Sequence, residues 1–434
     1  MNLNRVVAAD RLLASEVGDP AWWAQVATEE APWREFVAHG TMCVTFIWRD
    51  PYGNEQTSPI KRVYIDINSV THHHSLDPQS LQRIAGTDVW FWQVERPAAW
   101  RGSYVFIPVT AEHLPPHAQG DEKAQYLAQR HWWRSIMDLA VSDPLNPLVT
   151  HSTDWSGALS ALHLPQAPEQ SAWHALDTGM ATQPDSQRFT ALDWYSQRLG
   201  KRRKVWMYTT GSAGDEIQNQ RPLVLLLDGQ RWAQQMPIYS ALDFETRRGR
   251  LPAAVYVLID AIDSQQRNED LSCNKAFWQA IQDELLPWVI DTIPGNPSAE
   301  CTVVAGQSLG GLAAMYAGLH WPERFNGVLS QSGSFWWPYI ELLNAPSGQP
   351  YPRQPGAAGG LAEWLRTGGQ PAGRLRIFQE VGSHEDVMID VNDSLHEALI
   401  QAGHQVHYQI FEGGHDGLCW RGGLLDGLAW LLAE

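Results

Sequence analysis

Residues 302–311 read Thr-Val-Val-Ala-Gly-Gln-Ser-Leu-Gly-Gly, and they place one serine, Ser308, between a run of β-forming residues and a run of small ones. The GxSxG pattern at 306–310 therefore stands in a strand–turn–helix context, in which this motif presents a nucleophilic serine. The flanking glycines allow a sharp turn and a close approach of strand and helix. We expect Ser308 to be a nucleophile at the carboxyl edge of a sheet, with an ordinary glycine-rich turn as the alternative.

Apolar runs on both sides of this stretch extend the prediction to a whole sheet. Uninterrupted apolar strands are expected at 223–227, 254–259, 302–305, 327–329, 375–378 and 406–411, separated by helical patterns. Strands that are apolar on both faces are typical of a mostly parallel sheet covered by helices. The sequence thus predicts an α/β fold of the α/β-hydrolase type.

A serine nucleophile needs a base and an acid, and in this fold they follow it in the order acid, then histidine. His415 lies in a glycine-rich loop directly after the last predicted strand, which is where an imidazole would face Ser308. Two adjacent carboxylates, Glu385 and Asp386, follow the strand at 375–381. We expect Glu385 to orient the imidazole. Asp386 and then Asp416 remain alternatives.

The oxyanion of the reaction needs backbone N–H donors. One is expected from Leu309, which follows the nucleophile directly, and the other from the loop after the strand at 223–227. That loop contains Gly229, Gln230 and Arg231.

The front of the chain has a different pattern. Aromatic and β-branched runs separated by turns predict an antiparallel β-sandwich-like domain over 1–160. Residues 161–188, rich in Pro, Gln, Ser and Ala, are expected to form a linker or an extended wrap. The catalytic domain is expected over 189–434.

Composition excludes several classes of function. A formal net charge of −17 argues against a nucleic-acid-binding protein. The four cysteines are widely spaced, so we expect neither disulfides nor a structural metal site. We find no secretory signal at the start of this sequence and no apolar run of membrane-spanning length, and therefore expect a cytoplasmic protein without a membrane partner.

Several motifs together resemble the enterochelin (enterobactin) esterase family, in the esterase-D-like branch of the α/β-hydrolases. The stretches that carry this resemblance are 227–232, 258–263 with Arg267, 306–311, 330–337 and 413–423. The similarity is strong over about residues 195–434 and weaker over the front domain. It implies a cytoplasmic esterase that cleaves the serine-ester bonds of ferric tri-catecholate siderophores. Ser308 would be the nucleophile, His415 the base and Glu385 the acid.

A ferric tri-catecholate is a bulky trianion with aromatic faces, so its site should offer cations and flat apolar surfaces. The resemblance places Arg267 at the mouth of the site. The other residues expected to contact the substrate lie on loops at the same edge of the sheet: Arg231, Trp232, Trp336, Trp337, Trp420 and Arg421. No metal or organic cofactor is expected, because iron enters only with the substrate.

Two other functions remain open from the sequence: a general carboxylesterase or acyltransferase acting on acyl-sugars or thioesters, and a siderophore-binding protein without catalysis. A binding protein gives no reason for a serine on a strained turn and a loop histidine. The sequence leaves undecided the oligomeric state, the role of the front domain and the preference for ferric, iron-free or glucosylated substrate.

Overall fold

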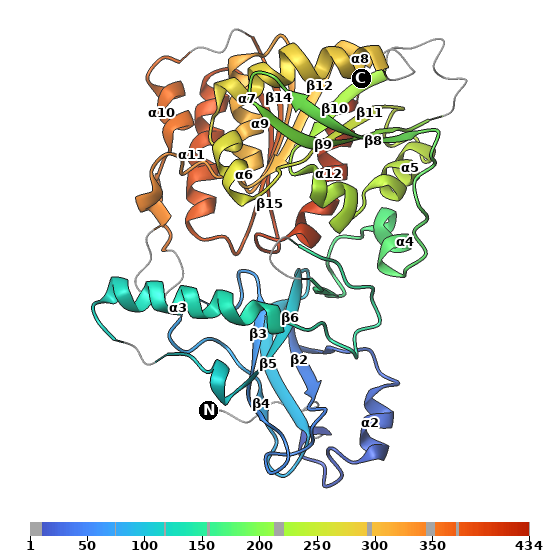
Figure 1. Cartoon of the computed structure of the whole chain (residues 1–434), viewed down its shortest axis with the longest axis vertical. Coiled ribbons are helices and arrows are strands. Elements are labelled where there is room, and N and C mark those ends of the chain that lie inside the picture. The colour runs from blue at the N-terminus through green and yellow to red at the C-terminus, as the bar shows by residue number, and fades with distance from the viewer. Residues whose placement is uncertain are drawn as a thin grey trace.

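Three β-sheets organise the chain in this computed structural model (Figure 1). The structure describes residues 11–433 apart from 74, 117–118, 154–156, 212–220, 293–296, 344–351 and 370–372. Two small antiparallel sheets form the front of the chain, and one eight-stranded sheet forms the rest.

The front part is built from strands β1 to β7. One sheet has the order β1-β2-β5-β4 and the other β3-β6-β7, and all their pairings are antiparallel. Buried side chains from β2, β3, β5 and β6 pack between the two sheets, as in a sandwich. The antiparallel front sheets predicted from sequence are confirmed. The strands are β1 (Trp33–Ala38), β2 (Thr41–Arg49), β3 (Ile60–Ile67), β4 (Gln82–Arg83), β5 (Val89–Pro97), β6 (Arg101–Thr110) and β7 (Ser160–His163).

Helices flank this sandwich. Helix α3 packs Trp132, Trp133 and Ile136 on the outer face of β3 and β6. Helix α2 places Trp22 and Trp23 against β1 and β2. The bounds are α2 (Pro20–Val26), η1 (Ala111–His113), α3 (Glu122–Ile136) and η2 (Met137–Leu139).

The large sheet has the order β15-β14-β13-β12-β10-β11-β9-β8. The pairings from β15 to β11 are parallel, and β9 and β8 add antiparallel at one edge. The predicted mostly parallel α/β sheet is confirmed. Its strands are β8 (Phe189–Ser196), β9 (Lys201–Thr209), β10 (Arg221–Leu226), β11 (Val255–Ile259), β12 (Pro297–Gln307), β13 (Gly327–Gln331), β14 (Arg376–Gly382) and β15 (Gln405–Phe411).

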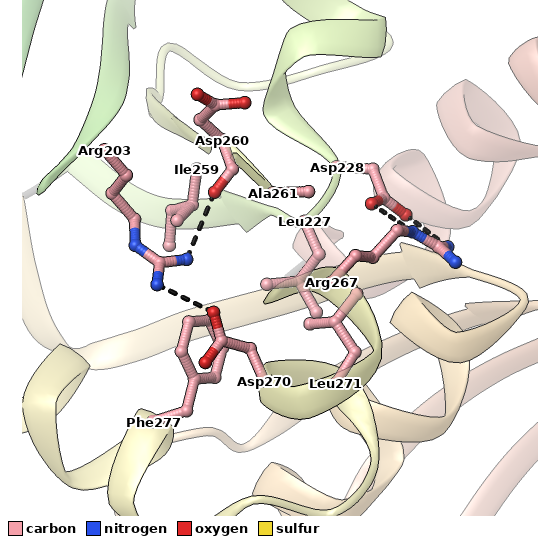
Figure 2. A pocket seen from close by; sticks show the side chains of 10 residues that line it. All are labelled: Arg203, Leu227, Asp228, Ile259, Asp260, Ala261, Arg267, Asp270, Leu271 and Phe277. Atoms are coloured by element: carbon pink, nitrogen blue, oxygen red, sulfur yellow. Dashed lines mark hydrogen bonds and ion pairs between the residues drawn. The ribbon is translucent and has the colours of Figure 1, made fainter. Parts of the chain in front are cut away.

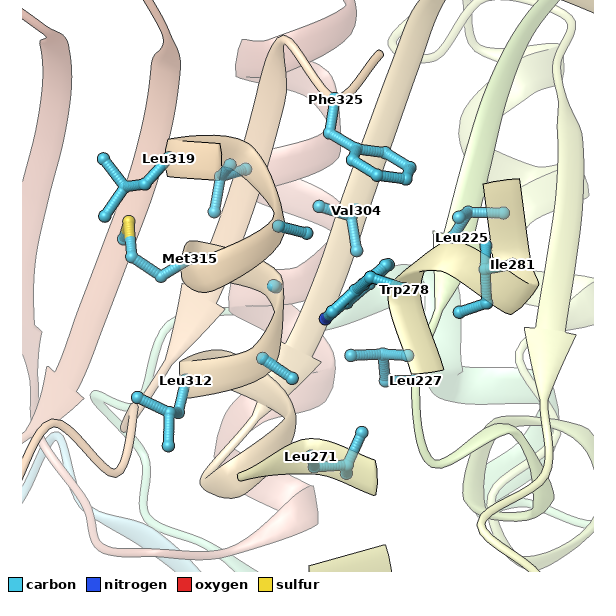
Figure 3. Close-up of a cluster of buried hydrophobic side chains, with 14 of the residues drawn as sticks. Leu225, Leu227, Leu271, Trp278, Ile281, Val304, Leu312, Met315, Leu319 and Phe325 are labelled. Carbon is cyan, nitrogen blue, oxygen red and sulfur yellow. The ribbon is translucent and has the colours of Figure 1, made fainter. Parts of the chain in front are cut away.

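Helices cover both faces of this sheet, so alternate residues of one strand enter two cores. In β10, Leu223 and Leu225 join the core beneath α7, α9, α10 and α11. Figure 3 shows part of that core, where Trp278 lies between Val304 and Leu227. Val224 and Leu226 point to the opposite face, covered by α5 and α12.

The bounds of these helices are η5 (Arg231–Gln235), α5 (Tyr239–Arg247), α6 (Ser264–Leu271), α7 (Lys275–Ala280), η6 (Ile281–Leu285), α8 (Leu286–Thr292), α9 (Leu309–His320), η7 (Ile340–Leu343), α10 (Gly360–Arg366), α11 (Val387–Gln401) and α12 (Gly417–Leu432). Within the described ranges, none of the helices is long and apolar enough to span a membrane.

The segment between the two parts of the chain is packed rather than free. It contains the end of β7 and the helical turns η3 (Ser171–Trp173) and α4 (His174–Asp177). Trp173 is 1% exposed, and its indole N–H donates to the carbonyl of Arg421 in α12 at 3.2 Å. This segment therefore wraps onto the last helix of the sheet domain.

Candidate active site

The candidate nucleophile Ser308 lies on the turn between β12 and α9. Its backbone has φ 58° and ψ −121°, a conformation that costs about 1–3 kcal/mol outside glycine. Two backbone hydrogen bonds of 3.0 Å hold it, from the Ser308 amide to Gln331 and from the Ser334 amide to Ser308. A side chain at position 306 would bring Cβ within 2.3 Å of the Gly310 carbonyl. Glycine is therefore required at 306 for β12 and α9 to meet.

Strained backbone gathers at this edge of the sheet. Of the seven described non-glycine residues with positive φ, five follow the ends of five adjacent strands: Asp228, Ile262, Ser308, Ser332 and Asp386. A sixth, Ser69, belongs to the front domain and contacts the loop after β15. Such strain persists where the surrounding structure fixes it, and it is typical of functional sites.

Glu385 and His415 meet next to the nucleophile turn. Glu385 follows β14 and His415 follows β15, the strand paired with β14. The Nδ1 of His415 donates to Oε2 of Glu385 at 2.6 Å. The Glu385 side chain is 1% exposed and the His415 side chain 31% exposed. A buried carboxylate thus holds the imidazole at Nδ1, which leaves Nε2 as the nitrogen that can exchange a proton with a substrate or nucleophile.

Two further hydrogen bonds fix the carboxylate of Glu385. Oε1 of Glu385 accepts from the Gly382 amide at 2.8 Å and from the Ser332 hydroxyl at 2.6 Å. The Ser332 oxygen accepts in turn from the indole N–H of Trp420 at 2.9 Å. The Trp420 ring also meets the His415 ring edge-on, with centroids 4.7 Å apart. Trp420 therefore supports both the acid and the base.

The hydroxyl of Ser308 bonds to Ser334 in this structure. The two Oγ atoms are 3.3 Å apart, and no hydrogen bond joins Ser308 to His415 among the residues described. Catalytic hydrogen bonds are often long in unliganded enzymes and tighten when substrate binds. Ser334 is 2% exposed. Sequence reasoning missed it, because only the turn after β13 brings it to the nucleophile.

The alternative acids Asp386 and Asp416 face other partners. Asp386 precedes α11, and burial raises the pKa of its carboxyl. Asp416 caps α12 through the Leu418 amide and also bonds to Ser103 of the front domain. Of the three carboxylates, Glu385 is the one bonded to His415.

The loop after β10 packs against the nucleophile turn. Asp228 forms two bonds with Arg267, at 2.6 and 2.7 Å (Figure 2). Arg267 also reaches the Gln307 carbonyl at 3.5 Å. Burial, the largest influence, would raise the pKa of Asp228, but the charge and hydrogen bonds of Arg267 and the charge of Arg231 together outweigh burial and lower this pKa. A Cβ at Gly310 would lie 3.3 Å from Oδ2 of Asp228. The ion pair therefore ties this loop to α6, and the loop also lies against the start of α9.

The expected oxyanion donors differ in their availability. Leu309 is the first residue of α9, and Gly229 and Gln230 begin the helical turn that continues into η5, so their amides lack partners within the helix. The amide of Arg231 already donates to the Asp228 carbonyl at 2.9 Å. The prediction that Arg231 supplies an oxyanion donor is therefore wrong, while the other three remain predictions.

Several expected substrate contacts are buried. Trp232 is 0% exposed and donates to the Gln307 side chain at 3.1 Å. Arg421 is 1% exposed and pairs with both carboxylate oxygens of Asp177. Because neither side chain has surface left for a ligand, direct substrate contact is a wrong prediction for both. Trp420, at 3% exposure, acts beneath His415 instead.

The remaining predicted contacts lie closer to the surface. Trp336 and Trp337 are half-buried after β13, with ring centroids 6.0 Å apart. The Arg231 guanidinium lies over the Trp420 ring at 5.2 Å. Arg267 keeps 21% of its side chain exposed despite its pairing with Asp228. These four side chains stay candidates for substrate binding.

A polar network lies beneath the nucleophile, inside the sheet. The Gln307 side chain donates to that of Gln331 at 2.8 Å, and Gln331 donates to Glu380 at 2.5 Å. Gln409 also donates to Glu380, at 2.8 Å. Complete burial raises the pKa of Glu380 to about 7. The network links β12, β13, β14 and β15 directly below the catalytic turn.

The front domain reaches the histidine loop (residues 412–416, between β15 and α12), and no motif in the sequence indicates this contact. The Ser69 hydroxyl accepts from the His415 amide at 3.4 Å. Ser103 bonds to Asp416 through its amide, at 2.6 Å, and through its hydroxyl, at 2.9 Å.

Within the described ranges, no cluster of three or more His, Cys, Asp or Glu side chains has the arrangement of a metal site.

Comparison with known proteins gives consistent matches. Residues 43–173 match the family model "Enterochelin esterase, N-terminal", and residues 196–431 match the model "Putative esterase". The chain is 50% identical to the iron(III) enterobactin esterase of Dickeya dadantii, over 98% of this chain and 95% of that protein. It is 44% identical to the Escherichia coli K12 protein of the same name, over 96% and 97%.

Solved structures agree. The enterobactin esterase FES from Shigella flexneri, crystallised in the presence of enterobactin, is 43% identical with a TM-score of 0.80, covering 96% of this chain and 98% of that one. The ferric enterobactin esterase from Salmonella typhimurium is 43% identical with a TM-score of 0.81, covering 95% and 98%.

Proposed function

Because the chain belongs to the iron(III) enterobactin esterase family, we propose that it hydrolyses the ester bonds of the ferric enterobactin trilactone with Ser308 as nucleophile, His415 as base and Glu385 as acid. The observation that carries the catalytic assignment is the 2.6 Å bond between His415 and Glu385, beside a serine on a strained strand–helix turn. The relatives supply the substrate class.

In the proposed reaction, the Ser308 hydroxyl turns from Ser334 toward Nε2 of His415 when substrate enters. Ser308 Oγ then attacks the ester carbonyl while the imidazole takes its proton. Glu385 stabilises the imidazolium. The oxyanion lies against the amides of Leu309, Gly229 and Gln230.

The tetrahedral intermediate collapses as His415 gives its proton to the departing serine hydroxyl of the substrate. Water then enters, His415 removes one of its protons, and attack on the acyl-enzyme releases the acid and restores Ser308. Every proton moves between His415 and an oxygen at the site, so the cycle uses no cofactor. Iron takes part as a component of the substrate.

The trianionic substrate must overcome the net charge of the protein, which is −17. Charges beyond about 8 Å are largely screened at physiological ionic strength. We propose that Arg231 and Arg267 provide the local positive charge and that Trp336 and Trp337 provide flat surfaces for the catecholate rings.

A direct test uses Ser308→Ala. Ferric enterobactin is incubated with each protein, and linear fragments are followed by mass spectrometry, while binding is followed by quenching of tryptophan emission. We expect the variant to bind ferric enterobactin and to release no linear fragments. Turnover at the wild-type rate would reject Ser308 as the nucleophile.

We also propose a cytoplasmic location. The described cysteines Cys43, Cys273 and Cys419 carry free thiols, as proteins of reducing compartments do. Fractionation of cells that express the tagged protein tests this, and recovery from an extracytoplasmic fraction would contradict it.

A further inference from the structure

The residue after the catalytic histidine is held by the front domain. Asp416 is 8% exposed, and its carboxylate lies between the start of α12 and strand β6. Oδ1 accepts from the Leu418 amide at 2.8 Å and from the Ser103 hydroxyl at 2.9 Å. Oδ2 accepts from the Ser103 amide at 2.6 Å. One serine of the front domain thus supplies two of the three donors to this carboxylate.

A third side chain fixes the Ser103 hydroxyl. Nε2 of His151 lies 2.9 Å from Ser103 Oγ. Because the single hydroxyl proton of Ser103 goes to Asp416, His151 must donate to Ser103, with its proton on Nε2. Burial lowers the pKa of His151, which favours the neutral ring, and the tautomer of that ring with its proton on Nε2 can make this donation. The order of donation is therefore His151 to Ser103 to Asp416.

Two further contacts join the same parts of the molecule. A Cβ at Gly414 would lie 2.5 Å from Cβ and Oγ of Ser69, so the backbone of the histidine loop touches the front domain. The Ser69 hydroxyl accepts from the His415 amide at 3.4 Å. The thiol of Cys419, in the first turn of α12, donates to the Arg101 carbonyl of β6 at 3.4 Å. The front domain thus contacts this segment before, at and after His415.

These contacts matter because the two glycines of the loop do not by themselves restrict its backbone. Gly413 and Gly414 precede His415, and glycine leaves a backbone free to take other conformations. Glu385 fixes the ring of His415 at Nδ1, but the position of the Cα depends on the bonds at each end of the loop. A displacement of about 1 Å in a catalytic group can lower a rate roughly 100-fold.

We propose that Ser103 is a positioning residue: by holding Asp416, the front domain sets the place of His415 relative to Ser308. The front domain is then required for the chemical step and not only for binding the substrate. Ser103 itself touches no reacting atom. This inference rests on the proposed roles of Ser308 and His415.

The experiment compares Ser103→Ala with Ser160→Ala. Ser160 is a matched control because it is also a buried serine of the front domain. Its hydroxyl accepts from the Asp143 amide at 2.8 Å and bonds to Tyr104, and among the described residues it makes no hydrogen bond to the histidine loop. Ser103→Thr keeps the hydroxyl and tests rescue. Asp416→Asn keeps a cap for α12 but places an amide N–H against the Ser103 amide donor.

Two readouts separate positioning from general stability. The first is kcat and KM for ferric enterobactin, measured at least 15 °C below the melting temperature of each variant. The second is the rate of labelling of Ser308 by a fluorophosphonate, which requires the base but not siderophore binding. We expect Ser103→Ala and Asp416→Asn to lower kcat and the labelling rate about 10-fold or more, consistent with a displaced base. KM should stay within about twofold, and Ser103→Thr should recover most of the loss.

Ser160→Ala should keep both rates within about twofold of wild type, whatever its melting temperature. Ser103→Ala with unchanged kcat and labelling would overturn the proposal, as would an equal loss in Ser160→Ala. If Ser103→Ala does not fold, the same rates for Asp416→Asn decide the question. If instead Ser308→Ala still releases linear fragments, the proposed function itself is wrong, and that outcome is distinct from failure of the Ser103 contact.

Discussion

At the scale of single residues, the site depends on side chains whose bonds are nearly all made before substrate arrives. Glu385 uses both oxygens, one for His415 and one for Ser332 and the Gly382 amide. Ser308 and His415 could be proposed from sequence because each belongs to a local pattern, a strand–turn–helix motif and a glycine-rich loop after the last strand. Ser332 and Ser334 could not, because their roles depend on how the turn after β13 lies against two other turns.

Exchange of the two adjacent acids tests the assignment of Glu385. In Glu385→Gln, the amide no longer holds the correct tautomer of His415 or stabilises its charge, and kcat should fall by about 1,000-fold or more. Asp386→Asn is the matched control and should keep kcat within a few-fold, because Asp386 has no bond to His415. Steady-state kinetics on ferric enterobactin decides; a larger loss in Asp386→Asn would contradict the assignment.

Glu380 makes stability depend on pH. Burial raises its pKa from 4.5 to about 7, so the folded protein keeps a proton that the unfolded chain has lost. The contribution of this retained proton to the unfolding free energy is fully present below about pH 4.5. It is lost as pH rises to about 7, at about 1.4 kcal/mol per pKa unit. Relative to Glu380→Gln, the wild type should therefore lose about 3 kcal/mol of unfolding free energy between pH 4.5 and pH 8.

Urea denaturation of both proteins at pH 4.5 and pH 8 measures this difference. The quantity compared is the unfolding free energy of the wild type minus that of Glu380→Gln. If this quantity is the same at both pH values, or is larger at pH 8, the pKa of Glu380 is not raised.

At the scale of elements, the contact between β12 and α9 fixes the nucleophile. The strands of the parallel sheet were predictable because each is an apolar run. β8 was not, because half of its residues are exposed, as expected for the edge of the sheet. Composition predicted a linker or an extended wrap over 161–188, and Trp173 in that segment packs into the core beneath α5 and α12, as in a wrap. Composition does not report such a long-range contact.

Gly306→Ala tests the contact between β12 and α9. The added methyl would overlap the backbone of Gly310, so strand and helix must separate at an overpacking cost of about 3 kcal/mol. Gly157→Ala is the control, because a Cβ there meets nothing within 4 Å. Urea denaturation compares the two variants. If Gly306→Ala were as stable as Gly157→Ala, the close contact between β12 and α9 would not require glycine at position 306.

At the scale of the whole molecule, buried polar bonds join the parts of the chain. The ion pair between Arg421 and Asp177 connects α12 to α4, in the segment between the two parts of the chain. The Arg421 side chain is 2% exposed. The sequence correctly predicted two kinds of structure along the chain, antiparallel first and α/β second. It did not predict how they meet, because Ser103 and Asp416 are 313 positions apart and neither belongs to a recognisable motif.

Asp177→Ala tests the connection through Arg421. It leaves a buried guanidinium without its counter-charge, which should lower the unfolding free energy by about 3 kcal/mol. Adding Arg421→Met should recover part of this loss, because the unpaired charge is then gone. Asp283→Ala is the control: its pair with Arg198 is exposed at 58% and 39%, and it should cost less than about 1 kcal/mol. Full stability of Asp177→Ala would contradict this account.

The bond between Ser103 and Asp416 also has a consequence for biosynthesis. A ribosome extends a chain at about 5–20 residues per second, so the 313 positions between the two partners take roughly 15–60 s to translate. During that interval the front domain has emerged from the exit tunnel and can fold, while the aspartate it will hold has not been made. We therefore expect each nascent chain to be inactive until α12 has been made, and a prematurely terminated product that lacks α12 to have no esterase activity.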